Sequence, residues 1–364
     1  MSDASHIAIL GTVGLPARYG GFETLAARLV EAAAARGIAD RLTVWCSGPQ
    51  APGDRPASWG GAQLRYLPLR ANGAQSVAYD AVSLWQAARS GHGAALLLGV
   101  SGATALPVIR AASRMRVITH LDGIEWQRPK WGAAQRAVLR RSEAMAARWS
   151  HAVIADNPEI AAHVRRAYGR VPVEIAYGHE TAPPAADGTA LCDLPHRYAL
   201  AVARAEPENN LALMLDTVAR GATLPLVVLA NWQATPHGRA LHARYCDTPG
   251  LFLREAEYDP ARLAAIRAAA TLYLHGHSAG GTNPALVEMM GTGVPIAAFD
   301  CAFNRATTQD RAAYFATADE LAMLLPRMVG TAEAAANGRA MREIAQRRYR
   351  WRDVTDAYFN LLGL

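Results

Sequence analysis

A glycine-rich turn stands between an apolar run and a proline in residues 275–295, HGHSAGGTNPALVEMMGTGVP. Gly280 and Gly281, with Thr282, allow the backbone to approach a ligand closely. Asn283 occupies the position of a helix N-cap before Pro284, because proline is favoured at the first helical position. A helix that begins there offers backbone amides and the positive end of its dipole to an anion. The stretch therefore predicts an anion site without lysine, most simply for a diphosphate.

Two charged side chains could complete such a site. Glu288 falls one turn inside the predicted helix, where its oxygens could accept hydrogen bonds from two sugar hydroxyls. The alternative is a solvated surface glutamate. Arg204 follows another apolar run, and its guanidinium could donate hydrogen bonds to diphosphate oxygens. Its alternative is a salt bridge with Glu206 or Glu208.

Several kinds of chemistry are disfavoured by what the sequence lacks. Lys130 is the single lysine, so no Gly-Lys-Ser/Thr exists and P-loop kinases and ATPases are excluded. The loop at 11–24, GTVGLPARYGGFET, does not match the GxGxxG of dinucleotide oxidoreductases, which weakens the hypothesis of a hydride-transferring enzyme. The four cysteines have no zinc or disulfide spacing, and no Asp-x-Asp occurs, so we expect a metal-free mechanism and no cofactor.

These residues need a scaffold, and the chain alternates short apolar runs with longer helical patterns. In the first half we predict strands at 6–10, 42–46, 93–100, 116–121 and 151–156, with helices such as 22–36 and 132–148. In the second half we predict strands at 198–203, 224–230, 250–255, 271–276 and 294–299, with helices near 210–220, 260–269 and 284–290. The pattern predicts two Rossmann-like, doubly wound α/β domains facing a cleft.

The predicted boundaries follow from composition and periodicity. The first domain spans 1–180, a proline-rich linker 181–197, and the second domain 198–345. An amphipathic helix in 346–364 is expected to pack across the domains.

Six segments, spread in order along nearly the whole chain, together resemble the rhamnosyltransferase branch of the retaining glycosyltransferases of family four. They are GTVGLPARYGGFETLA at 11–26, LDGIEWQRPKW at 121–131, ADNPEI at 155–160, VARAEPENN at 202–210, the stretch at 275–290 and FDCAFNRATTQDRAAYF at 299–315. The resemblance implies a GT-B fold in which the N-terminal domain holds the acceptor, the C-terminal domain holds the nucleotide sugar, and the last helix returns to the first domain.

Two departures from the wider superfamily bear on the donor. The superfamily's pair of glutamates is reduced to Glu288, since Gly280 stands at the first position, and its Arg-Lys pair becomes Arg204 and Asn209. Both departures are similar to those of the rhamnosyltransferase branch and favour a deoxy sugar.

Further donor contacts are expected in the second domain. Tyr258 could cover the nucleobase, although it could equally be a core residue. His275 and His277 flank Gly276 at a strand end, and one of them, for which we take His277, could donate to phosphate or sugar, or be satisfied locally.

In the first domain, the resemblance implies that a loop facing the cleft touches the donor sugar or the acceptor through Tyr19, Gly20, Gly21 and Glu23. The alternative for Glu23 is that, as an acid in the first turn of a helix, it interacts favourably with the helix dipole.

Polar residues at two neighbouring strand ends in the first domain could serve the acceptor: His120, Asp122 and Glu125 after one strand, and Asp156 with Asn157 after the next. Asp122 and Asp156 could orient an acceptor hydroxyl and stabilise an oxocarbenium-like transition state, and with Arg204 and Glu288 they form the expected catalytic set. Asp156 could equally be the N-cap of a helix from Pro158.

The net charge of +6 suits anionic ligands or lipid surfaces and only weakly suggests nucleic acid. Arginines and tryptophans interleave between Arg114 and Trp149, as at an anionic membrane surface or on a solvated helix face. The N-terminus lacks a signal-peptide pattern and no apolar stretch reaches roughly 18 residues, so we expect a cytoplasmic protein with peripheral membrane contact.

Taken with the resemblance, these features predict a glycosyltransferase that moves L-rhamnose from dTDP-β-L-rhamnose to a polyprenyl-diphosphate-linked saccharide during bacterial surface-polysaccharide assembly, with no nucleic-acid partner. Two alternatives stay open. A nucleotide-sugar 2-epimerase of the same architecture would convert its donor without an acceptor, and a non-catalytic sugar-nucleotide-binding subunit would bind a donor without transferring it.

Overall fold

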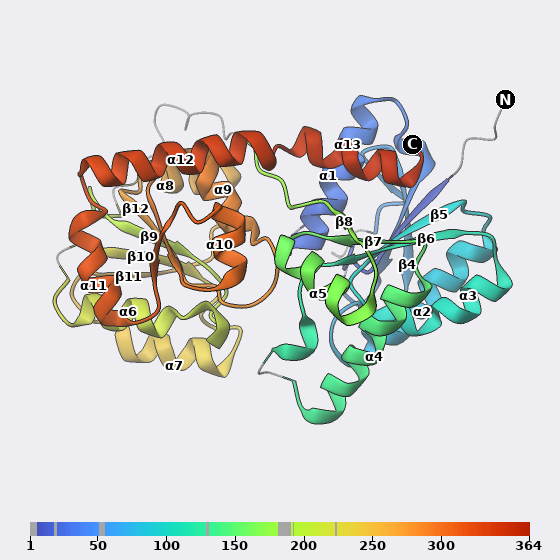
Figure 1. Ribbon diagram of the computed structural model, residues 1–364, viewed down its shortest axis with the longest axis horizontal. Coiled ribbons are helices and arrows are strands. Elements are labelled where there is room, and N and C mark those ends of the chain that lie inside the picture. The colour runs from blue at the N-terminus through green and yellow to red at the C-terminus, as the bar shows by residue number, and fades with distance from the viewer. Residues whose placement is uncertain are drawn as a thin grey trace. The chain divides into compact units, whose positions relative to one another are not determined.

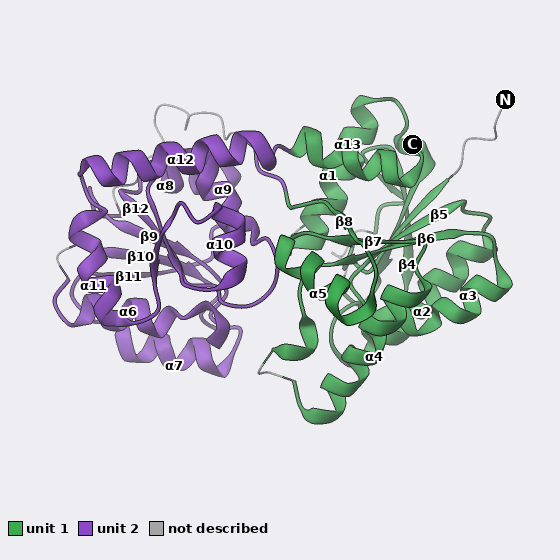
Figure 2. Ribbon diagram, viewed as in Figure 1, with its two compact units in different colours: residues 1–177, 351–364 green, residues 178–350 purple. Residues whose placement is uncertain are grey.

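The structure is a computed structural model that describes residues 6–17, 20–50, 55–128, 131–180, 191, 193–222 and 224–364 (Figure 1). It divides into two compact units (Figure 2): unit 1 contains residues 1–177 and 351–364, and unit 2 contains residues 178–350. The chain thus passes between the units twice, and the sequence predicts two such passages, a linker at 181–197 and the return of the helix in 346–364. Residues 181–190 and 192 of that linker lie outside the described residues.

The described part of unit 1 is built on an eight-stranded sheet in the order β3-β4-β2-β1-β5-β6-β7-β8. All neighbouring pairs are parallel except β3 with β4. Its strands are β1 (Ile7–Leu10), β2 (Leu42–Ser47), β3 (Ser58–Trp59), β4 (Ala62–Leu67), β5 (Ala94–Leu98), β6 (Arg116–Leu121), β7 (Ala152–Ala155) and β8 (Val173–Glu174). Its helices are α1 (Gly21–Ala35), α2 (Ser76–Arg89), α3 (Leu106–Ala112), α4 (Ala133–Trp149), α5 (Pro158–Tyr168) and α13 (Trp351–Leu362), with 3-10 turns η1 (Ala39–Arg41), η2 (Gly73–Gln75), η3 (Ser101–Ala105) and η4 (Glu125–Gln127).

The order of these strands decides which face of the sheet each helix covers. From β1 the chain moves outward through β2 to β4, then returns to β5 on the other side of β1 and continues to β8. Because such crossovers are right-handed, α1 lies on one face while α2, α3 and α4 lie on the other, as Figure 1 shows.

The last helix, α13, returns to unit 1 and packs beside α1. Arg36, the C-cap of α1, pairs with Asp356 of α13, and the ring of Trp351 meets that of Tyr177 edge-on, with centroids 4.7 Å apart. The predicted return of the C-terminal helix to the first domain is therefore confirmed.

The described part of unit 2 has a six-stranded, all-parallel sheet in the order β11-β10-β9-β12-β13-β14. Its strands are β9 (Ala199–Val202), β10 (Leu226–Ala230), β11 (Leu251–Glu255), β12 (Leu272–His275), β13 (Ile296–Phe299) and β14 (Ala313–Phe315). Its helices are α6 (Leu211–Ala219), α7 (Pro236–Tyr245), α8 (Pro260–Ala269), α9 (Pro284–Thr292), α10 (Ala302–Thr308), α11 (Ala318–Arg327) and α12 (Ala332–Arg348), with a 3-10 turn, η5 (Pro207–Asn209). The predicted pair of doubly wound α/β domains is confirmed.

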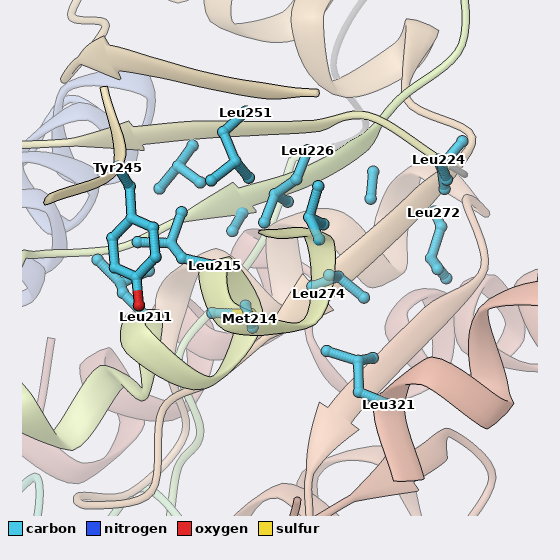
Figure 3. Close-up of a cluster of buried hydrophobic side chains, with 14 of the residues drawn as sticks. Leu211, Met214, Leu215, Leu224, Leu226, Tyr245, Leu251, Leu272, Leu274 and Leu321 are labelled. Atoms are coloured by element: carbon cyan, nitrogen blue, oxygen red, sulfur yellow. The ribbon is translucent and has the colours of Figure 1, made fainter. Parts of the chain in front are cut away.

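The core of unit 2 shows why its strands read as continuous apolar runs. Leu272 and Leu274 of β12 join a buried cluster with residues of α6, α7 and α11, including Leu215, Tyr245 and Leu321 (Figure 3). The alternate residue Tyr273 is fully buried as well. Helices cover both faces of this parallel sheet, so every position in the strand favours an apolar side chain.

Candidate functional site

In the part of unit 2 that the structure describes, the strand order of the sheet reverses between β9 and β12. The chain runs from β9 through β10 to β11, then crosses to β12 on the other side of β9 and continues to β13. In open α/β sheets, ligands bind at the carboxyl ends of the two strands that flank such a switch point. The loop that follows β9 carries Arg204 and Asn209, and the loop that follows β12 carries residues 276–283.

Hydrogen bonds fasten these two loops to each other. The Asn210 side-chain amide donates to the carbonyl oxygen of Gly276 at 2.8 Å. The backbone amide of Ser278 donates to the carbonyl oxygen of Glu208, also at 2.8 Å. Gly276 permits this approach, since a Cβ there would stand 2.1 Å from the carbonyl oxygen of Asn209. The two loops therefore form one unit of structure.

The orientation of His277 follows from its partner. The Asn209 side-chain nitrogen donates to the carbonyl oxygen of Arg204 at 2.9 Å, which leaves its oxygen 2.7 Å from Nδ1 of His277. That ring nitrogen must carry the proton, because an amide oxygen only accepts. The Nε2 atom of a neutral His277 is then an acceptor, which suits a sugar hydroxyl better than a phosphate.

The turn before α9 has the features of an anion cradle. Gly280 has a φ of +95°, and Gly280, Gly281 and Thr282 are buried. Asn283 is the N-cap, and its side-chain oxygen accepts from the amide of Ala285 at 3.0 Å. No acceptor in the described part of the chain receives a hydrogen bond from the amides of Gly280, Gly281 or Asn283. The amides of buried residues normally have partners, so the open amides of Gly280 and Gly281, with that of the half-buried Asn283 beside them, suit an anionic ligand.

The amides that are open in the structure are not those that the sequence predicts. The first amides of α9 are already used, since Leu286 and Val287 donate to the carbonyl oxygen of Asn283. The open donors therefore lie in the turn, one step before the helix.

Arg204 is exposed just beyond β9, and its guanidinium forms no hydrogen bond or ion pair with any residue that the structure describes. The alternative of a salt bridge with Glu206 or Glu208 is therefore wrong. An exposed guanidinium at the same sheet edge as the open amides can bind a diphosphate without first breaking an ion pair.

Glu288 is partly exposed, and its carboxylate pairs with Arg267 of α8. About a third of its side chain is exposed. Its Oε1 atom is the oxygen that Arg267 leaves open to a sugar hydroxyl. Its predicted role in donor binding and catalysis stays a prediction.

Tyr258 is exposed rather than part of the core. It lies between β11 and α8, at the carboxyl edge of the same sheet and two strands away from β9. Its predicted contact with a nucleobase also stays a prediction.

His275, next to the cradle, is buried with only 3% exposure, and burial lowers its pKa from 6.5 to about 3. A histidine of lowered pKa binds fewer protons folded than unfolded, so stability is lost as the pH falls from about 6.5 toward 3, by about 1.4 kcal/mol per pH unit. We expect His275→Gln to flatten the fall of melting temperature between pH 7 and pH 5. The exposed His196→Gln is the control, and equal slopes in the two variants would contradict the assignment.

Unit 1 has its own switch point, between β1 and β5. The loop after β1 contains Gly20, with a φ of +125°, directly before Gly21 at the start of α1. Glu23 is 8% exposed, and its carboxylate accepts from the amide of Val13 at 2.8 Å. This geometry assigns Glu23 to holding the loop in shape. Tyr19, predicted to contact the acceptor, lies outside the described residues.

Neighbouring strands of unit 1 bring the predicted acceptor residues to one edge. His120, one residue before the end of β6, is buried, and Asp122 directly after the strand is half-buried. Asp156 follows β7 with 6% exposure. Glu125 in η4 pairs with Arg128 at 2.7 Å.

Asn157 has a local role. It is fully buried and caps α5, its side-chain oxygen accepting from Glu159 at 3.0 Å. The alternative that Asp156 is this N-cap is therefore wrong. The cap bond and the burial assign Asn157 to holding the start of α5, and its predicted contact with the acceptor stays a prediction.

One residue of this edge was not predicted. The hydroxyl of Tyr358, in α13, lies 3.0 Å from Nδ1 of His120, and both side chains are buried. Burial, and then the charges of Asp156 and Asp122, raise the pKa of Tyr358 well above 10. The hydroxyl therefore stays protonated and lies near both carboxylates. The sequence shows Tyr358 only as part of an apolar helix face, which is why it was missed.

Comparison with known proteins places the fold. Residues 4–180 match the family described as "Domain of unknown function (DUF1972)". No curated protein matches the sequence.

The solved structures that resemble the chain do so over almost its whole length. Sucrose-phosphate synthase from Thermosynechococcus elongatus has a TM-score of 0.83 at 18% identity, covering 98% of both chains. HepE from Anabaena in complex with UDP has a TM-score of 0.73 at 15% identity, covering 98% of this chain and 99% of that one. The trehalose 6-phosphate synthase from Burkholderia multivorans has a TM-score of 0.74 at 13% identity, covering 99% of this chain and 96% of that one. The protein has the GT-B glycosyltransferase fold.

Proposed function

We propose that this protein is a retaining glycosyltransferase that transfers L-rhamnose from dTDP-β-L-rhamnose to a polyprenyl-diphosphate-linked saccharide. The observation that carries the proposal is that the Arg204 guanidinium and the open amides of Gly280, Gly281 and Asn283 belong to the two loops at one switch point. Both groups are donors that suit a diphosphate. HepE, which shares the fold, has been solved with UDP and with UDP-glucose, which supports a nucleotide sugar as donor.

In this proposal the donor is held by unit 2. Arg204 and the amides of the turn bind the diphosphate, Tyr258 covers the base, and His277 and Glu288 accept from sugar hydroxyls. The single carboxylate at Glu288, shared with Arg267, suits a sugar with fewer hydroxyls. This is why a deoxy sugar is favoured.

The chemistry follows from the same groups. The acceptor oxygen bonds to the anomeric carbon on the face from which the phosphate departs, the bond from that carbon to the phosphate oxygen breaks, and the acceptor proton passes to the departing oxygen. Arg204 and the turn amides offset the charge of the leaving diphosphate. Asp122 and Asp156 of unit 1 orient the acceptor and stabilise positive charge at the sugar carbon.

The proposal is tested by incubating the full chain with dTDP-rhamnose, with and without a lipid extract that contains polyprenyl-linked saccharides. We expect release of thymidine diphosphate and a labelled lipid only when the extract is present. Conversion of the donor without extract would instead indicate an epimerase. Donor binding without turnover in either condition would indicate a non-catalytic binding subunit.

A further inference from the structure

The exposed faces of three helices of unit 1 are unusually basic. In α2, α3 and α4, all of whose residues the structure describes, every carboxylate is buried: Asp80 is 3% exposed and Glu143 is 1% exposed. The exposed arginines of these helices are Arg89, Arg110, Arg136, Arg140, Arg141 and Arg148. The three helices cover the same face of the sheet (Figure 1). This face therefore presents positive charge that no exposed carboxylate of its own helices offsets.

Large apolar side chains are exposed on the same three helices. Val82 and Trp85 of α2 are 38% and 41% exposed, Val108 of α3 is 59% exposed, and Val138 of α4 is 49% exposed. Single exposed apolar residues are ordinary, but here they accompany the arginines on three adjacent helices.

The first half of α4 is the most accessible part of this face. Residues 132–138 are all exposed, although Ala133, Ala134, Ala137 and Val138 are apolar. The second half is anchored by Glu143, whose carboxylate accepts from Trp126 at 3.1 Å, His163 at 2.6 Å and Tyr168 at 2.7 Å. A buried anchor thus holds α4 while its beginning stands open to a partner.

The structure also revises which residues of the 114–149 region can meet a partner. Trp126 points to the buried Glu143, Arg128 pairs with Glu125, and Arg116 donates to the carbonyl oxygen of Leu361 at 3.3 Å. Arg140 of α4 does lie over the Trp126 ring, with its guanidinium carbon 5.3 Å from the ring centroid, but Arg116 and Arg128 have partners elsewhere, so the interleaved arginines and tryptophans of the sequence are only partly one surface. The accessible set is the arginines and valines of α2, α3 and α4.

We propose that the exposed face of α2, α3 and α4 docks on an anionic lipid interface, with the first half of α4 making the principal contact. Valine and tryptophan side chains enter the boundary between headgroups and acyl chains, while guanidinium groups bind lipid phosphates. A nucleic acid would use the arginines but would gain nothing from the exposed valines. The docking rests on the proposed function only in that a lipid-linked acceptor gives it a purpose.

The test is co-sedimentation of the full chain with vesicles of phosphatidylcholine alone or mixed with phosphatidylglycerol, in the absence of any nucleotide sugar. We expect binding to the mixed vesicles, weakened by salt, and little to the neutral ones. The combined variant Arg136→Gln, Arg140→Gln and Arg141→Gln should bind roughly a hundredfold more weakly, since each basic residue near such a surface contributes about 1 kcal/mol.

A matched control removes the same charge from unit 2, through Arg220→Gln, Arg239→Gln and Arg339→Gln, and should bind as the parent does. Val138→Ser, which leaves the charge of the face unchanged, should weaken vesicle binding without changing the retention of the chain on single-stranded RNA. Equal loss in the α4 variant and the control, or RNA binding tighter than vesicle binding, would overturn the proposal. Because no donor is used, failure here leaves the glycosyltransferase proposal untouched.

None of the helices in the described ranges combines the length and apolar character needed to span a bilayer.

Discussion

Replacing Arg204 with alanine is expected to weaken the binding of thymidine diphosphate by about 10- to 150-fold, because a charge-assisted hydrogen bond contributes about 1.5–3 kcal/mol. The guanidinium is exposed and has no partner among the described residues, so its removal should cost binding and little stability. Titration calorimetry measures the first quantity. The melting temperature without ligand measures the second.

Arg220→Ala is the matched control for this variant. Arg220 is also an exposed arginine of unit 2, but it pairs with Asp319 at 3.2 Å on the surface. We expect its loss to leave nucleotide binding unchanged. A thermal shift with dTDP-rhamnose that persists undiminished in Arg204→Ala would remove Arg204 from the diphosphate site.

Gly276→Ala is expected to destabilise unit 2 strongly. The added Cβ would stand 2.1 Å from the carbonyl oxygen of Asn209 and 2.8 Å from the terminal carbon of Met214. The backbone oxygen cannot move without separating the loops after β9 and β12. Overpacking of this kind costs roughly 1–3 kcal/mol, so the melting temperature should fall by several degrees.

The same substitution should also reduce donor affinity, because it separates Arg204 from the turn amides. Gly132→Ala is the control, since its Cβ would meet nothing closer than 3.5 Å. A Gly276→Ala protein as stable as the control, with unchanged affinity for thymidine diphosphate, would show that the two loops are not held together as described.

The fold could be predicted from the sequence because parallel strands covered on both faces read as continuous apolar runs. The strand expected at 271–276 is β12 at Leu272–His275, and the helix expected near 260–269 is α8 at Pro260–Ala269. Short elements gave no such signal. β8 and β14 have two and three residues, too few to show a period.

Local parts of the candidate site were equally accessible to prediction. Asn283 caps α9 as expected, since an N-cap before a proline depends on residues adjacent in the chain. The contacts that give the site its geometry join distant residues. His277 and Asn209 are 68 positions apart, and Tyr358 and His120 are 238 apart. No periodicity reports such pairs, which follow only from strand order and from the return of α13 to unit 1.

The residue type of a side chain also could not predict how deeply it is buried or which partner it has. A glutamate at position 23 could favour the helix dipole or contact a ligand, but the structure commits it to the amide of Val13. Arg204 beside two glutamates could form a salt bridge, but it forms none with the described residues.

The most direct test of the account is a crystal structure of the protein with thymidine diphosphate. We expect the diphosphate within hydrogen-bond distance of the Arg204 guanidinium and of the backbone amides of Gly280, Gly281 and Asn283. A nucleotide bound elsewhere, with those amides still without a partner, would contradict the assignment of the switch point between β9 and β12 as the donor site.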